Sequence, residues 1–112
     1  MNIPKAPSLK ESLGLPVLES AGGLVCNRNH HVLLMFKRGK WDMPKGRIEE
    51  NTTREESAIR EVNEETGLNP DKLEIQCKLV STWHTTRHEN VRYLKKTHWF
   101  LMHISLLVHK CT

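Results

Sequence analysis

The stretch Arg60-Glu61-Val62-Asn63-Glu64-Glu65-Thr66-Gly67-Leu68 decides both the fold and the chemistry expected of this chain. On a helix, residues three and four apart share a face, so Glu61, Glu64 and Glu65 are predicted to converge while Val62 turns toward a core. Three carboxylates so close repel one another unless a cation lies among them. Mg²⁺ and Mn²⁺ prefer such oxygen ligands, and Mg²⁺ commonly adds water and phosphate oxygens to its shell.

A loop with two cations precedes this helix and decides between a metal site and an ordinary solvated acidic face. Glutamate is a good helix former, so the acidic triplet alone favours the solvated face. The loop, however, places a proline, a glycine, Lys45 and Arg47 directly before the carboxylates, in the order Trp41-Asp42-Met43-Pro44-Lys45-Gly46-Arg47-Ile48-Glu49-Glu50. This combination of loop and helix favours a site for a metal and a phosphate.

From Gly46 to Leu68 the chain resembles the signature box of the Nudix hydrolases. The box pattern is glycine, five residues, glutamate, seven residues, and then Arg-Glu-aliphatic-any-Glu-Glu-any-Gly-aliphatic, and Thr52 replaces its first glutamate. Every other element matches. Upstream, Ala21-Gly22-Gly23-Leu24-Val25 and Val32-Leu33-Leu34-Met35 resemble the leading strands of the family.

The resemblance implies a Mg²⁺-dependent or Mn²⁺-dependent enzyme that hydrolyses a nucleoside diphosphate linked to a further group X. Water would attack phosphorus, while metal and cations neutralise the developing charge. The implied metal ligands are Glu61, Glu64, Glu65 and a backbone carbonyl at Lys45 or Gly46. Glu61 is assigned as ligand or general base, and with Glu64 and Arg60 it forms the implied catalytic set. Arg60 is expected to orient the glutamates.

Cations before the box are predicted to hold the substrate. The net charge is +4, and its cations gather at Lys37, Arg38, Lys40, Lys45 and Arg47. Such a basic collar suits a polyanion. The predicted substrate-binding residues are Arg38, Lys45, Arg47 and Trp41. Trp41 either stacks on a base or packs beneath the loop, and packing is the more common role for an aromatic residue beside a Pro-Lys-Gly turn.

Thr52 is the one departure from the box. A threonine cannot ionise and cannot match a carboxylate in a charge-assisted bond to Arg60. Either Glu55 or Glu56 compensates, or catalysis is slower; structurally, Thr52 caps the helix or reflects drift. The departure also leaves open a non-catalytic module that binds nucleotides without turning them over.

The order of elements predicts an α/β (α+β) fold, which the resemblance makes a mixed sheet with the box helix. Residues 1–16 are expected to form an N-terminal arm and residues 17–112 the Nudix-like domain. Strands are predicted over 17–27 and 31–38, around the turn at 27–29, with a loop over 39–51. Thr52 or Thr53 starts the helix and Gly67 ends it. Further strands are predicted over 73–83 and 93–108.

The polar loop between these last strands contains His84 and His88. Their spacing suits a zinc pair on a helix, but Thr85 and Thr86 are β-branched and favour solvated loop histidines instead.

The chain is expected to be shortened at its C-terminus, without the helix that usually covers the sheet of the family. The segment 97–108 is β-prone and nearly uncharged, so we expect an adhesive edge and a possible homodimer through it.

Composition narrows the function further. Three cysteines, Cys26, Cys77 and Cys111, have no metal-site spacing and favour reduced thiols in the cytoplasm. No stretch is long enough for a membrane span, and no basic run with interleaved aromatics supports stable nucleic-acid binding. The expected partner is a soluble nucleotide, either a nucleoside triphosphate or a dinucleoside polyphosphate. Removal of pyrophosphate from RNA 5′ ends is the second enzymatic possibility.

Overall fold

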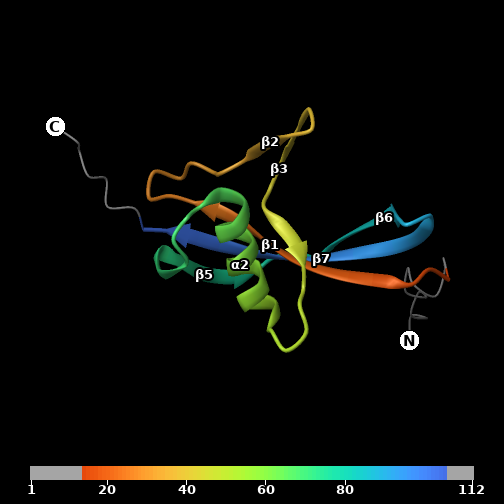
Figure 1. Ribbon diagram of the computed structural model, residues 1–112. Helices are drawn as coiled ribbons and strands as arrows, with labels where there is room; N and C mark the ends of the chain where they lie inside the picture. Colours follow the sequence, from red (N-terminus) through yellow and green to blue (C-terminus); the bar gives the residue numbers. More distant parts are fainter. Residues whose placement is uncertain (1–13, 106–112) are drawn as a thin grey trace, which may run out of the picture.

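Two long parallel strands form the centre of the structure, a computed structural model that describes residues 14–105. β1 (Val17–Cys26) and β7 (Val91–Ile104) lie side by side over ten residue pairs (Figure 1). β4 (Lys45–Arg47) pairs antiparallel with β1 on one side, while β5 (Leu73–Lys78) and β6 (Thr82–His88) pair with the two halves of β7. The mixed sheet expected of an α+β fold is confirmed.

Helix α2 (Arg54–Thr66) lies across one face of this sheet, over the half that carries β4 and β5 (Figure 1). Its N-cap is Thr53, whose hydroxyl accepts a hydrogen bond from Glu56 N at 3.0 Å. Thr52 is therefore not the cap; its hydroxyl donates to Glu49 O at 2.7 Å and lies 2.8 Å from Ser57 Oγ. Gly67 ends the helix with φ of 76°, the left-handed conformation that glycine permits. A 3-10 helix, Pro70–Lys72, leads into β5.

The core lies between α2 and the central strands. It contains Ala21 and Val25 from β1, Ala58 and Val62 from α2, and Phe100, Met102 and Ile104 from β7. Gly23 allows this close packing, because a Cβ there would come within 2.9 Å of both Val62 and Met102. A close approach of this kind is a common reason for glycine inside a strand.

Two segments that were predicted to be loops, 39–51 and the polar segment before the last strand, contain strands instead. In both regions, residues of positive φ form the tight turn that joins two strands. The segment 39–51 contains β3 (Lys40–Asp42), which pairs with β2 (Met35–Lys37), and also β4. Arg38 and Gly39, with φ of 52° and 77°, form the tight turn between β2 and β3. Similarly, Glu89 and Asn90 have φ of 50° and 66° and join β6 to β7, so the histidines of the predicted polar loop stand on a strand.

The predicted adhesive edge at 97–108 is also wrong over the residues described. Residues 97–104 lie on β7, which has β1 on one side and β5 and β6 on the other. Its hydrogen-bonding groups are therefore paired within the sheet. Up to Ile104, therefore, this strand offers no free edge through which a dimer could form. Residues 106–112 and the first thirteen residues of the expected arm lie outside the described part of the chain.

A buried histidine joins β7 to β1 on the face that carries α2. His98 is 1% exposed, and its Nε2 lies 2.9 Å from Glu19 Oε1, while Nδ1 lies 3.4 Å from Ser81 Oγ. Burial lowers the pKa of His98, and the hydrogen bond from His98 lowers the pKa of Glu19. Both directions agree with a neutral ring that donates from Nε2 to a charged carboxylate and accepts at Nδ1.

This arrangement predicts that acid destabilises the fold through His98. In the unfolded chain His98 binds a proton near pH 6.5, whereas burial lowers its pKa in the folded protein. The free energy of unfolding is therefore unaffected above that pH and falls as the pH drops below it. In His98→Gln, the loss of unfolding free energy between pH 7 and pH 5 should be smaller, by at most about 1.4 kcal/mol per pH unit. Urea denaturation at several pH values measures this slope.

The matched control is His88→Gln, since His88 is exposed on β6. The window from pH 7 to pH 5 separates His98 from Glu19, whose contribution is lost only below its ordinary value of 4.5. Equal slopes in wild type and His98→Gln would show that this ring does not titrate on unfolding.

Candidate active site

Two of the three helix carboxylates reach the edge strand β4. Glu65 Oε2 accepts a hydrogen bond from Lys45 N at 3.3 Å. Glu61, whose side chain is 13% exposed, lies against Gly46, where a Cβ would overlap with its carboxyl group. The glycine that opens the box therefore leaves the space in which the Glu61 carboxylate lies.

Arg60 ties the carboxylates to the loop before the helix. Its guanidinium donates to Glu61 Oε1 at 3.0 Å and to Arg47 O at 2.8 Å, and it pairs with Glu49 Oε2 at 3.1 Å. Burial disfavours the charge, but these partners outweigh it and raise the pKa of Arg60 above its ordinary value. Arg60 thus holds helix, loop and β4 together.

The predicted convergence of three glutamates is wrong for this structure. Glu64 is 55% exposed, and its Oε1 lies 3.6 Å from Arg60 Nε, too far for a good hydrogen bond. Within residues 14–105, no three His, Cys, Asp or Glu side chains are grouped closely enough to hold a metal ion. The reason is that each carboxylate has its own partner: Lys45 N for Glu65 and different nitrogens of Arg60 for Glu61 and Glu64.

The donors nevertheless fit a hard cation such as Mg²⁺. Glu61 and Glu65 are one helical turn apart and contact neighbouring residues of the same strand, where the Gly46 carbonyl is a further oxygen. Carboxylate and carbonyl oxygens are the ligands that Mg²⁺ prefers. Glu64, three residues after Glu61, is exposed on the same side of the helix.

Glu49 occupies the role that sequence reasoning assigned to Glu55 or Glu56. Among the described residues, Arg60 pairs with Glu49 on its outer side, whereas Glu56 binds the Thr53 cap and Glu55 is exposed. Glu49 lies three residues before Thr52 and is linked to it by the Thr52 hydroxyl. The loop therefore supplies a carboxylate to Arg60 although the box position is a threonine.

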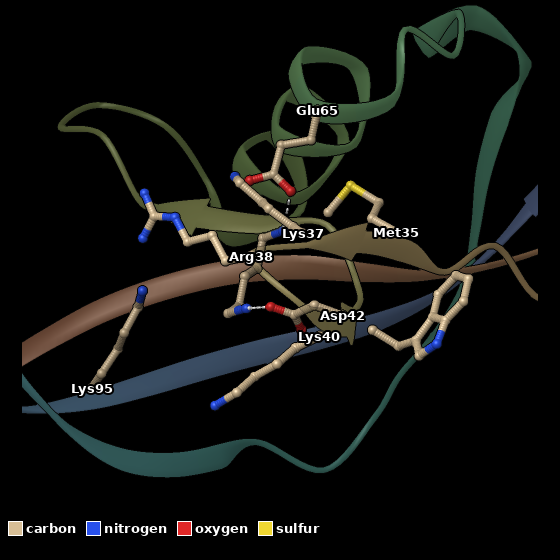
Figure 2. Close-up of a pocket in the computed structure, with 9 residues that line it drawn as sticks. Met35, Lys37, Arg38, Lys40, Asp42, Glu65 and Lys95 are labelled. Carbon is tan, nitrogen blue, oxygen red and sulfur yellow. Dashed lines mark hydrogen bonds and ion pairs between the residues drawn. The ribbon is translucent and has the colours of Figure 1, made fainter.

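A pocket of about 690 Å³ opens beside these carboxylates (Figure 2). Its walls combine five cations with two acids, and the members are Lys37, Arg38, Lys40, Lys45, Lys95, Asp42 and Glu65, with Met35 and Trp41. Figure 2 shows Glu65 descending from α2 toward the cations of the strands below. This is the volume of a typical ligand site, and its net charge suits an anion.

Lys45 and Asp42 form an ion pair inside this pocket. Burial opposes the charge of Asp42, but hydrogen bonds from Lys45 and from Met43 N outweigh it and lower the pKa of Asp42. Asp42 therefore stays ionised and holds the Lys45 ammonium group in place at the base of the pocket.

Three of the four predicted substrate-binding residues line the pocket: Arg38, Lys45 and Trp41. Trp41 does not pack beneath the loop, because it is 69% exposed and contacts Phe36 across the β2–β3 pair, with ring centroids 5.1 Å apart. Arg47 does not line this pocket; it lines a smaller one nearby. Sequence reasoning missed Lys95, which comes from β7, far along the chain, and which no motif marks.

His84 and His88 are not a zinc pair. They stand four residues apart on β6, which separates them by about 13 Å at the usual rise of a strand. Both histidines lie on the face of the sheet that carries Lys95, and His84 is the cross-strand partner of Lys95.

Comparison with known proteins finds a matching family model and several relatives. The NUDIX domain family model matches residues 17–110. An 8-oxo-dGTP diphosphatase from Proteus vulgaris is 29% identical over 91 residues, which cover 73% of this chain and 78% of that protein. An RNA pyrophosphohydrolase from Histophilus somni is 31% identical over 96 residues, which cover 76% of this chain and 50% of that protein. The chain thus spans about half the length of such RNA pyrophosphohydrolases.

Among solved structures, a C. elegans Ap4A hydrolase binary complex superposes with a TM-score of 0.63 and 19% identity, over 80% of this chain and 68% of that one. At this identity the likeness concerns the fold alone. No helix in residues 14–105 has the length and apolar character needed to cross a membrane.

The contacts of Arg60 predict that it contributes more to stability than Arg54, the other arginine of α2. Arg60→Gln should lower the free energy of unfolding by about 1–3 kcal/mol, because Glu61 and Arg47 O lose a partly buried charged partner. Arg54→Gln is the matched control: its side chain is 54% exposed, its ion pair to Glu19 is 3.9 Å long, and we expect a change within about 0.5 kcal/mol. Equal effects in urea denaturation would contradict the assignment.

Proposed function

Because this chain belongs to the Nudix family, we propose that it is a Mg²⁺-dependent pyrophosphohydrolase of a soluble nucleotide. The substrate would be a nucleoside diphosphate linked to X, with a nucleoside triphosphate or a dinucleoside polyphosphate as the best candidates. The observation that carries this proposal is the basic pocket that opens directly beside Glu65 and the box helix. The reduced thiols of Cys26 and Cys77 suit the cytoplasm, where such nucleotides occur.

In the proposed reaction the box residues have different roles. Bound Mg²⁺ would supply charge neutralisation on the phosphate oxygens. Glu64 and Glu65 are assigned as ligands, with Gly46 O beside them and Glu61 as ligand or general base. Glu61 suits the second role because Arg60 engages its Oε1 and leaves the other oxygen able to accept a proton from water. Arg60 is a positioning residue that fixes the direction of the Glu61 carboxylate.

The pocket residues are proposed to hold the two ends of the nucleotide. Arg38 and Lys45 would bind phosphate oxygens, and Lys95 adds a third cation on the opposite wall. Trp41 is placed to stack on the base, since its ring is exposed at the pocket and braced by Phe36. Arg47 would act next to this pocket, not within it.

RNA 5′ ends are the second candidate substrate. Two observations favour them: the relatives named RNA pyrophosphohydrolases, and the cations that continue along the sheet beyond the pocket. Strong salt dependence and preference for a triphosphorylated oligonucleotide over free nucleotide would identify this activity.

Hydrolysis of a nucleotide panel with Mg²⁺ tests the proposed function. Glu64→Gln and Glu65→Gln should each lower turnover about a hundredfold or more, because each removes an anionic ligand assigned to the Mg²⁺ that neutralises charge on the reacting phosphates. Glu55→Gln, an exposed substitution on the same helix, is the matched control and should retain turnover. Release of phosphate or pyrophosphate is measured with and without a chelator. Binding of nucleotides without turnover in wild type would instead identify a non-catalytic Nudix module.

The pairing of Arg60 with Glu49 predicts that a glutamate at position 52 can compensate for the loss of the Glu49 carboxylate. Glu49→Gln should lower turnover by about threefold to tenfold, because Arg60 loses a charged partner and Glu61 its fixed direction. Adding Thr52→Glu to that variant should restore turnover, since the box carboxylate would then serve Arg60. Steady-state rates of wild type, both single variants and the double variant test this.

In the wild-type background, Thr52→Glu alone should change turnover little. A large gain there would show that Glu49 does not fill the role, and no rescue in the double variant would show the same.

A further inference from the structure

The face of the sheet opposite α2 is unusually basic around β1, β4 and β7. Side chains alternate along a strand, and Lys45 points away from α2, because its Cβ and the Trp99 ring both lie over Gly22 on that face. Arg47, two residues on, shares this face, and so does Lys95, two strands away in the register Leu18 to Lys95. These three cations stand together without an acidic residue between them on these strands.

A second cavity, of about 230 Å³, lies on this face. The side chains that line it on this face are Arg47 from β4, Ser20 from β1, Lys95 from β7, and Thr86 and His88 from β6. Arg87 also lines the cavity, but its pairing with Arg92 places its side chain on the other face of the sheet. No acidic side chain lines the cavity, in contrast to the larger pocket, where Asp42 neutralises Lys45. Within residues 14–105, the Arg47 side chain forms no ion pair.

A second polar group next to this cavity is without a partner. Thr97 is buried beside Ser20 in the parallel register, and its hydroxyl has no hydrogen-bond partner within the described residues. Buried hydroxyl groups are normally satisfied by protein, water or a ligand. One buried hydroxyl group without a partner therefore lies next to Ser20, which lines the cavity.

Lys95 joins the two cavities, because it lines both. Its pKa is lowered by burial and by the charge of Lys45, which shows that cations crowd one another here. An anion that runs past Lys95 would relieve this repulsion in both cavities at once. The smaller cavity lies below the usual range of a nucleotide-sized site, about 300–1,000 Å³, but is large enough for phosphate groups.

We propose that this smaller cavity is a subsite for the phosphate groups of a linear polyphosphate chain that continues past the pyrophosphate held in the larger pocket. The inference rests on the proposed function and deepens it: of the candidate substrates, it selects those with a long polyphosphate chain. Arg47 provides a planar fork of N–H donors for phosphate oxygens, and Lys95 holds the phosphate at the junction.

Calorimetric titration with two inorganic probes, pyrophosphate and linear tetrapolyphosphate, tests the subsite in chelator-containing buffer. Wild type should bind tetrapolyphosphate at least about tenfold more tightly than pyrophosphate, since only the longer chain reaches both cavities. In Arg47→Gln, the affinity for tetrapolyphosphate should fall about tenfold, while that for pyrophosphate stays within about twofold. Equal affinities for the two probes in wild type would overturn the proposal.

Two control variants separate the subsite from general electrostatics. Arg54→Gln removes the same charge elsewhere, and a loss of tetrapolyphosphate affinity as large as in Arg47→Gln would refute the subsite. Arg47→Lys keeps the charge and should stay within about threefold of wild type. Both positions are exposed, and circular dichroism checks that each variant is folded.

A tetranucleotide of RNA distinguishes a polyphosphate chain from a nucleic-acid strand. We expect it to bind no more tightly than pyrophosphate; tighter binding than tetrapolyphosphate that is lost in Arg47→Gln would contradict the proposal. These titrations require no turnover, so the hydrolysis panel fails or succeeds independently of them. Nucleotide hydrolysis without a preference for tetrapolyphosphate would contradict only the proposed subsite. A preference for tetrapolyphosphate without nucleotide hydrolysis would contradict only the proposed enzymatic function.

Discussion

The ion pairs and hydrogen bonds of Arg60 are the interaction on which the candidate site depends. One guanidinium engages Glu61 on its own helix, Glu49 in the preceding loop and the Arg47 carbonyl on β4. Because these groups come from three elements, Arg60 fixes how α2 is placed against the edge of the sheet. A lysine could not do this, since a single ammonium group lacks the planar set of donors that faces several acceptors at once.

The edge strand β4 completes that arrangement through its backbone. Lys45 N binds the Glu65 carboxylate, and Gly46 has no side chain, so Glu61 can lie against the strand. Pro44, which is buried, begins this approach, and its carbonyl accepts a hydrogen bond from Gly23 N at 3.1 Å. The loop residues of the box thus have a structural role: they bring β4 close to α2, whose acidic side chains would otherwise be solvated.

The helix and its ends could be predicted from the sequence because they depend on local spacing. The acidic face, the Gly67 terminus and the start near Thr53 are all set within a few residues. The short strands at 40–42 and 45–47 were not predicted, since their pairing depends on distant partners and on backbone turns at Arg38 and Gly39. For the same reason Lys95 was missed: its place at the pocket follows from the parallel register of β7 with β1.

The division of charge explains why both faces of the sheet are needed. Acidic side chains descend from α2 onto one side of β4, while Lys45 and Arg47 project from the other side, next to Lys95. A protein with net charge +4 can keep glutamates close together here because cations only one strand away lower the local repulsion. In the proposed reaction the same cations would attract a polyanion to this edge, so the strand that separates the charges would also bring phosphates next to the carboxylates.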